Sequence, residues 1–284
     1  MPELERYVLA LLAKLDATLR QAVDDFDFNT YTRALVDFCN EDLSAFYFDI
    51  RKDSLYCDAA DDPKRMACRT VLDTLFHALV RYAAPVLVFT SEEVWGTRFP
   101  GEGSVHLLEW PEVPANTTRH PGEGRGPTDL SASPQGQLDP GLRRDDELVG
   151  KWDILRELRN KVTEAIEPLR RDKVIGSSLE AEVVIWHPLV PDDEDSDDFD
   201  EQRKLISDLL ITDLGKVHLT NLTLEIGGSG RPYSLVEMDD GQILVRRTAH
   251  HKCGRCWRHL PEVTEDGALC SRCDQVVAAM DAVA

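Results

Sequence analysis

Residues 3–24, ELERYVLALLAKLDATLRQAVD, decide the fold class of this 284-residue chain. Their apolar side chains recur every three or four residues, as at Leu4, Leu15 and Leu19, with charged residues between them. That spacing gathers the apolar side chains on one face of an α-helix. The stretch therefore predicts an amphipathic helix that packs one face against a partner.

The same spacing continues downstream. Asn29 is expected to cap a second helix, Pro63 to begin a third and Thr90 to open a short fourth. Because the joints between them are short, we predict an antiparallel helical bundle over residues 1–112.

A change of composition follows. Residues 113–145 are rich in Pro, Gly, Ser and Arg and show no apolar periodicity, so we predict a disordered insert or linker at a domain boundary. Residues 146–247 then read as a small α+β domain that opens with a helix over residues 147–172, closed by Gly176. The remaining elements predicted there are strands over 179–186, 217–226 and 243–246, a helix over 200–210, and a turn at 227–230.

The charge of the chain is unevenly distributed. Taken alone, the net charge of -20 argues against a polyanionic partner. Eight of the ten residues from 192 to 201 are acidic, however, and form one solvated run. Residues 246–259 carry five Lys or Arg, three His and no acid, so they are the most basic stretch. With no bilayer-length apolar run and no signal segment, a soluble, cytoplasmic protein is expected.

Four of the seven cysteines form two CxxC pairs, Cys253 with Cys256 and Cys270 with Cys273. Two such turns complete a tetrahedron of thiolates, which predicts one structural Zn²⁺ with no open coordination position. A redox dithiol pair and an iron–sulfur cluster are the alternatives. The remaining cysteines, expected to be buried apolar residues, are Cys39, Cys57 and Cys68.

Catalytic motifs do not emerge from the chain. It has no P-loop, HExxH or GxSxG pattern, so by itself it does not read as an enzyme. Trp257, directly after Cys256, can stack on a nucleotide base or pack over the metal knuckle.

Several motifs resemble bacterial isoleucyl-tRNA synthetase. They are LVDFCNEDLSAFYFDIRKDSLYCD (35–58), APVLVFTSEEVW (84–95), IGSSLEA (175–181), and KCGRCWRHLPEV (252–263) with LCSRC (269–273). The resemblance implies the anticodon-binding bundle of a class I synthetase, a junction domain over 146–247 and a zinc element over 248–284. The fold class expected is thus mainly α, with a small α+β domain and a C-terminal zinc ribbon.

The resemblance also limits the activity that can be expected of this chain. The family's catalytic and editing domains have no counterpart here, so no catalytic residue is assigned, and ATP enters only through the missing core. The chain is expected to be a C-terminal part of a longer synthetase or a truncated gene product. The partners implied are tRNA(Ile) and the catalytic part of the synthetase, with neither DNA nor membrane.

Proteins read RNA sequence mainly in single-stranded loops. We therefore expect the zinc element, together with the basic stretch at residues 246–259, to bind the anticodon loop. The predicted contacts are Arg246, Arg247, Lys252, Arg255, Trp257 and Arg258. A secondary basic set is Arg156, Arg159, Lys161, Arg170, Arg171 and Lys173. The rival hypothesis is a stand-alone zinc-ribbon module that docks a protein without binding RNA.

Overall fold

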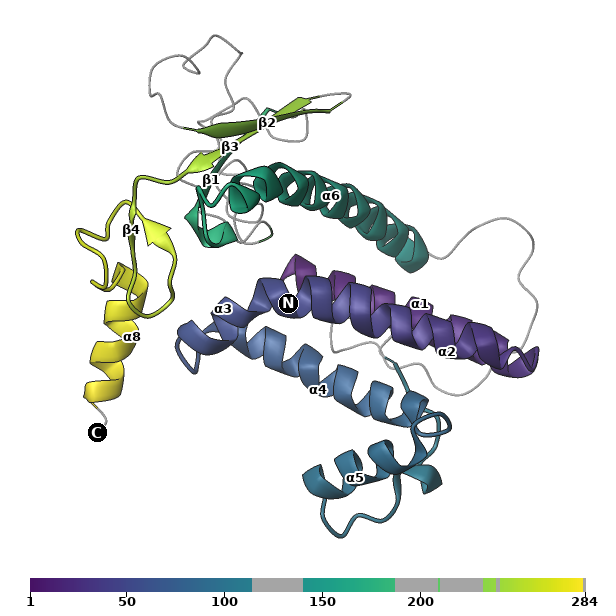
Figure 1. Cartoon of the computed structure of the whole chain (residues 1–284). Helices are drawn as coiled ribbons and strands as arrows, with labels where there is room; N and C mark the ends of the chain where they lie inside the picture. Colours follow the sequence, from purple (N-terminus) through teal and green to yellow (C-terminus); the bar gives the residue numbers. More distant parts are fainter. Residues whose placement is uncertain (114–139, 187–208, 210–231, 239–240, 283–284) are drawn as a thin grey trace. The chain divides into compact units, whose positions relative to one another are not determined.

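The protein is described by a computed structural model that covers residues 1–113, 140–186, 209, 232–238 and 241–282 (Figure 1). It is mostly helical with a small antiparallel sheet, as predicted. The chain divides into two compact units, the first made of Met1–Asp49 and Ala60–Trp152, the second of Ile50–Ala59 and Asp153–Ala284. The four-part division into domains stays a prediction.

The first unit is built from helices. The pattern predicted two of them correctly, α1 at Glu3–Asp24 and α4 at Pro63–Ala83. α1 packs against both α2 and α4 (Figure 1). The other helical elements that contribute to this unit are α2 (Phe28–Asp37), the π-helix η1 (Phe38–Phe48), α5 (Val88–Arg98) and the short η2 (Val105–Leu107).

The prediction for the second helix was wrong at its beginning. Asp27, not Asn29, caps α2, because its carboxylate accepts hydrogen bonds from the Thr30 backbone N at 3.1 Å and from Thr30 Oγ1 at 2.6 Å. The helical path then continues without a break through η1 into α3 (Asp49–Cys57). A π-helix has wider hydrogen-bonded turns than an α-helix, and the apolar spacing does not distinguish the two.

A partly buried polar cluster links the helices of the first unit. The Asp16 carboxylate accepts hydrogen bonds from Tyr82 Oη at 2.5 Å and Trp110 Nε1 at 2.6 Å. Tyr31 Oη in turn donates to the Tyr82 carbonyl at 2.7 Å. Together these hydrogen bonds connect α1, α2 and α4.

The first part of α6 (Pro140–Arg171) belongs to this unit, and its Trp152 packs into the core of the unit. Trp152 is fully buried, its ring stacks on Tyr7 with centroids 5.2 Å apart, and its Nε1 donates to Glu3 Oε1 at 3.0 Å. α6 begins at Pro140, so residues 140–145 are helical where an insert was predicted. Proline fits the first turn of a helix, which the composition-based interpretation overlooked.

The second unit contains a three-stranded antiparallel sheet in the order β1-β3-β2. Buried β-branched pairs such as Ile185 and Ile243 lie opposite each other in its register. β1 and β3 confirm predicted strands, whereas β2 was missed because the side chains of residues 233–237 are exposed or half-exposed and show no apolar pattern. Their bounds are β1 Ala181–Trp186, β2 Tyr233–Met238 and β3 Gly241–Arg247.

The predicted strand over 217–226 and the turn over 227–230 lie outside the described residues, as does the predicted helix over 200–210 apart from Leu209. Within the part of the chain that is described, no helix has the length and apolarity needed to cross a bilayer.

The end of α6 differs from the prediction. The helix ends at Arg171, and Lys173, not Gly176, adopts the left-handed conformation that closes it, with φ 58°. The Val174 and Ile175 backbone N–H groups then both reach the Leu169 carbonyl, at 2.9 and 3.3 Å. The early turn buries Ile175 against the unit, although a non-glycine residue pays about 1–2 kcal/mol for this conformation.

Candidate metal centre and nucleic-acid interface

The zinc-type element is assembled from a small hairpin and a helix. β4 (His251–Lys252) pairs with β5 (His259–Leu260), and the first CxxC pair occupies the turn between them. The second pair lies at the beginning of α8 (Ser271–Asp281), where Cys270 takes the N-cap position.

Close backbone approach holds the two halves of this element together. Gly254 N donates to the Ala268 carbonyl at 3.0 Å, and Gly267 N donates to the Lys252 carbonyl at 2.9 Å. A Cβ atom at Gly254 would lie only 2.4 Å from the Gly267 carbonyl oxygen. Gly267 itself has φ 96°, a conformation that glycine adopts without strain.

The four cysteines converge as predicted. All are buried, and their sulfur atoms lie within 4.8 Å of one another, the one such group of possible ligands found among the described residues. The Cys256 and Cys270 Sγ atoms are 3.9 Å apart. Sulfurs bound at 2.3 Å to a tetrahedral Zn²⁺ are separated by about 3.8 Å, so the donor set and spacing fit this ion.

The surroundings of the sulfurs favour thiolate at one position. Burial by itself raises the pKa of Cys253, but backbone hydrogen bonds, including one from Cys270 N at 3.3 Å, outweigh it and bring that pKa to about 6. At Cys256, Cys270 and Cys273 burial prevails and raises the pKa. Those thiols would lose their protons on metal binding.

Two arginines of the CxxC turns hold the element to the end of α3. Arg272 Nη1 donates to Asp53 Oδ2 at 2.7 Å and to Asp58 Oδ1 at 2.8 Å. Arg255 Nη1 donates to the Cys57 carbonyl at 2.5 Å and lies 3.8 Å from Cys273 Sγ. Both guanidinium groups thus bring positive charge towards a thiolate-rich centre.

The cysteines outside the CxxC pairs have different surroundings. Cys57 and Cys68 are buried as predicted, whereas Cys39 is only partly buried. Cys57 packs in the same apolar cluster as the four candidate ligands. Neither the packing of Cys57 against this element nor the contact of Arg272 with Asp53 could be predicted from local sequence. The residues that meet are about 200 positions apart along the chain.

Two of the residues predicted to contact RNA are engaged within the protein. Arg246 makes a two-point ion pair with Glu182, its partner on β1, at 2.7 and 2.9 Å. Arg255 is held by α3, as described above. Arg247 is 62% exposed at its side chain and has only a loose contact with Glu180, at 3.8 Å. Arg258 is half-buried and adds a favourable charge interaction with Asp53.

Lys252 and Trp257 are, like Arg247, accessible members of the predicted contact set. Trp257 is 60% exposed, and its φ of 65° is unusual for a bulky residue. Lys252 Nζ lies 5.2 Å from the centre of the indole ring. An exposed indole with an ammonium group over its ring is compatible both with stacking on a base and with packing on the knuckle.

The comparison with known proteins decides the family. Residues 5–185 match the family described as "Anticodon-binding domain of tRNA ligase". The chain belongs to this family of anticodon-binding domains.

Its relatives narrow the resemblance to one kind of ligase. The chain is 48% identical over 282 residues to the isoleucine–tRNA ligase of Zymomonas mobilis, covering 98% of this chain and 25% of that protein. It is 41% identical over 278 residues to that of Ruegeria pomeroyi, covering 96% and 25%. The chain thus spans about a quarter of the length of these relatives, and the resemblance to the C-terminal part of isoleucyl-tRNA synthetase is confirmed.

Proposed function

We propose that this chain recognises the anticodon region of tRNA(Ile) as the C-terminal part of an isoleucine–tRNA ligase, in the cytoplasm. The observation that carries the proposal is the family match over residues 5–185, supported by relatives named isoleucine–tRNA ligase. Adenylation, transfer and editing belong to a catalytic part outside this chain. That part is therefore the second partner proposed.

In this proposal α1, α2 and α4 form the antiparallel bundle of the family and lie along the anticodon stem. The mutual packing of α1 with α2 and α4 supports it. An exposed apolar stretch at the start of α5, in which Phe89 is 90% exposed, offers a surface for the catalytic part. Apolar side chains gathered in this way are typical of protein contacts.

The contacts with the anticodon loop are proposed to come from Arg247, Lys252, Trp257 and Arg258. Trp257 supplies a ring face for one unstacked base, and Lys252 supplies charge for the adjacent phosphate. Arg246 and Arg255 position this surface through Glu182 and α3. The four cysteines would hold one Zn²⁺, whose part is to fix the turn that carries Trp257.

Filter binding on the full chain tests the proposal. Binding of isoleucine tRNA and of a different tRNA is compared at two salt concentrations, with metal content measured by mass spectrometry. We expect one zinc per chain, a preference for isoleucine tRNA, and affinity that falls as salt rises. Equal binding of both tRNAs would overturn the anticodon-reading role. One zinc with no RNA binding would favour a stand-alone zinc-ribbon module.

A further inference from the structure

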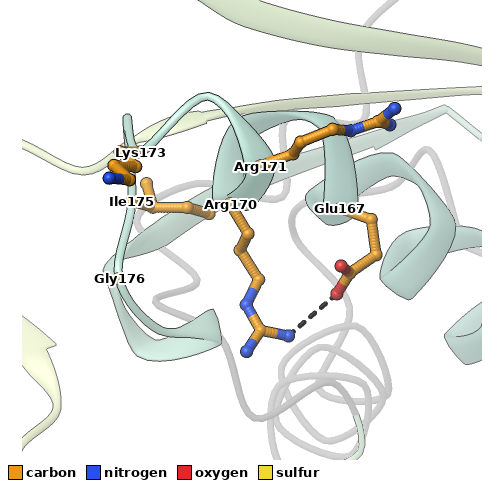
Figure 2. A pocket seen from close by; sticks show the side chains of 6 residues that line it. All are labelled: Glu167, Arg170, Arg171, Lys173, Ile175 and Gly176. Carbon is orange, nitrogen blue, oxygen red and sulfur yellow. Dashed lines mark hydrogen bonds and ion pairs between the residues drawn. The ribbon is translucent and has the colours of Figure 1, made fainter.

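The end of α6 carries a second group of cations in the same unit as the zinc-type element. Arg170 and Arg171 are the last residues of the helix, and Lys173 follows two positions later. With Glu167, Ile175 and Gly176 they line a hollow of about 490 Å³ (Figure 2). We call Arg170, Arg171 and Lys173 the basic turn.

The charge of the basic turn is only partly neutralised. Arg170 Nη1 contacts Glu167 Oε1 at 2.8 Å, between two half-exposed side chains. Across the described ranges, Arg171 and Lys173 have no acidic side chain within ion-pair distance. The lining of the hollow therefore offers three cations against the Glu167 carboxylate, with a second carboxylate, that of Glu180, bound to Gly176 N, and this excess of positive charge favours an anionic ligand.

The arrangement of the side chains indicates the size of that ligand. Figure 2 shows Arg170 extending towards Glu167 while Arg171 extends in a different direction from the next position of the helix. Cations that diverge from an open hollow do not converge on one phosphate group. They instead suit a polymer whose negative charges are spaced along a backbone.

Lys173 provides an independent reason to expect a ligand. Its φ of 58° belongs to the position after a helix where glycine is favoured. A glycine there would close α6 without strain, and the strained residue carries a charge that is exposed. Strain held at an exposed, charged position is typical of functional sites.

The alternative role is helix capping, since cations near a helix C-terminus interact favourably with its dipole. Arg170 and Arg171 lie in the last turn and are sufficient for that role. Lys173 lies outside the helix in a conformation that opposes stability. Capping therefore does not account for lysine at this position.

The basic turn is connected to the predicted RNA surface. Glu180 Oε2 accepts from Gly176 N at 3.3 Å and lies 3.8 Å from Arg247 Nη2. The Glu180 carbonyl also accepts from Thr248 N at 2.9 Å, where β3 leads into the zinc-type element. Arg247 thus lies near the basic turn, with the Glu180 carboxylate between them.

We propose that the basic turn binds backbone phosphates of the tRNA, outside the bases read at Trp257. The inference rests on the proposed function and adds a second, sequence-independent contact to it. Lys173 and Arg171 would each pair with a phosphate, so that the tRNA is held at two places on this unit.

Substitutions at Lys173 separate phosphate binding from helix capping. Lys173→Gly removes both charge and strain, Lys173→Ala removes only charge, and Lys173→Arg keeps both. At 0.1 M monovalent salt one lost phosphate contact weakens RNA binding about fivefold to eightfold. We expect that loss for Gly and Ala, near-normal binding for Arg, and a melting temperature of Lys173→Gly no lower than that of the unmodified chain.

Lys151→Ala is the matched control, because Lys151 lies on α6 away from the hollow, belongs to neither predicted contact set and pairs with Glu3 at 2.9 Å. Its affinity should change less than twofold. Hydroxyl-radical footprinting of isoleucine tRNA should show a patch of backbone protection lost in Lys173→Gly, while protection of the anticodon loop remains.

The outcomes distinguish this inference from the proposed function. If the unmodified chain shows no preference for isoleucine tRNA, the proposed function fails. If it shows that preference but Lys173→Gly and Lys173→Ala bind normally, or lose no more affinity than Lys151→Ala, the basic turn is not a phosphate site. A Lys173→Gly protein that melts at a lower temperature would assign the lysine to capping.

Discussion

Arg272 and Asp53 form a two-point ion pair, in which Nη1 donates to Oδ2 at 2.7 Å and Nη2 donates to Oδ1 at 3.0 Å. The two residues are 219 positions apart, and Arg272 directly precedes the candidate ligand Cys273. Parallel hydrogen bonds of this kind fix orientation as well as distance. The pair therefore holds the second CxxC turn at a set angle to the end of α3.

Replacing Arg272 with Met should weaken zinc retention. Asp53 and Asp58 would lose their half-buried cation, at a cost of about 2 kcal/mol for charged hydrogen bonds. The measurement is the rate of zinc transfer to a colorimetric chelator, and we expect this rate to be higher in the variant. Arg98→Met, which breaks the exposed pair of Arg98 with Asp73 in the other unit, is the control. Equal zinc release by both variants and the unmodified chain would contradict the prediction.

Gly254→Ala should disrupt the zinc-type element. The new Cβ would meet the Gly267 carbonyl oxygen at 2.4 Å, and backbone cannot yield as a flexible side chain does. We expect less than one bound zinc per chain by mass spectrometry. Gly150→Ala is the control, since nothing lies within 4 Å of its Cβ position in α6 and it should stabilise the helix by about 1 kcal/mol. Full zinc occupancy in Gly254→Ala would mean that the two turns are not closely packed.

Asp16 should titrate below its ordinary pKa of 3.8. Burial raises its pKa, but hydrogen bonds from Tyr82, Arg20 and Trp110 lower it further than burial raises it. A carboxylate with a depressed pKa stabilises the fold at pH above its unfolded value, and that stability is lost as pH falls through the folded pKa. Carbon-13 NMR titration of the carboxyl measures it. Tyr82→Phe should move the pKa of Asp16 upward, and no movement would remove the tyrosine as a cause.

Trp257→Ala should weaken binding of isoleucine tRNA by about 1–3 kcal/mol, the contribution of one stacked base. Trp257→Phe keeps an aromatic face and should retain most of the affinity. Because the side chain is 60% exposed, zinc content should be unchanged in both variants. If Trp257→Ala loses zinc together with RNA affinity, the ring supports the knuckle and does not act mainly as a stacking surface.

The features predicted well from sequence have local causes. Apolar spacing and Pro63 were enough to give the bounds of α1 and the beginning of α4. The spacing of the four cysteines was enough to predict that their sulfur atoms lie close together. In each CxxC pair the tight turn directs both sulfurs towards the same point.

The features missed depend on distant or competing interactions. Asp27 and Asn29 are both able to cap α2, and the contacts of the folded chain select the first. Lys173, and not Gly176 as predicted, closes α6 in the left-handed conformation. The backbone turns at this earlier residue, which allows the side chain of Ile175 to be buried. Arg246 and Arg255 looked accessible by composition, but their partners Glu182 and Cys57 come from other parts of the chain.

The discontinuous second unit affects the order in which the protein can fold during synthesis. Asp53 leaves the ribosome 219 residues before Arg272, which at bacterial elongation rates corresponds to a delay of roughly 10 to 45 s. For that time the last turn of α3, including Cys57, lacks the element that later covers it. The α3 segment must therefore stay soluble as an incomplete surface until the C-terminal cysteines emerge.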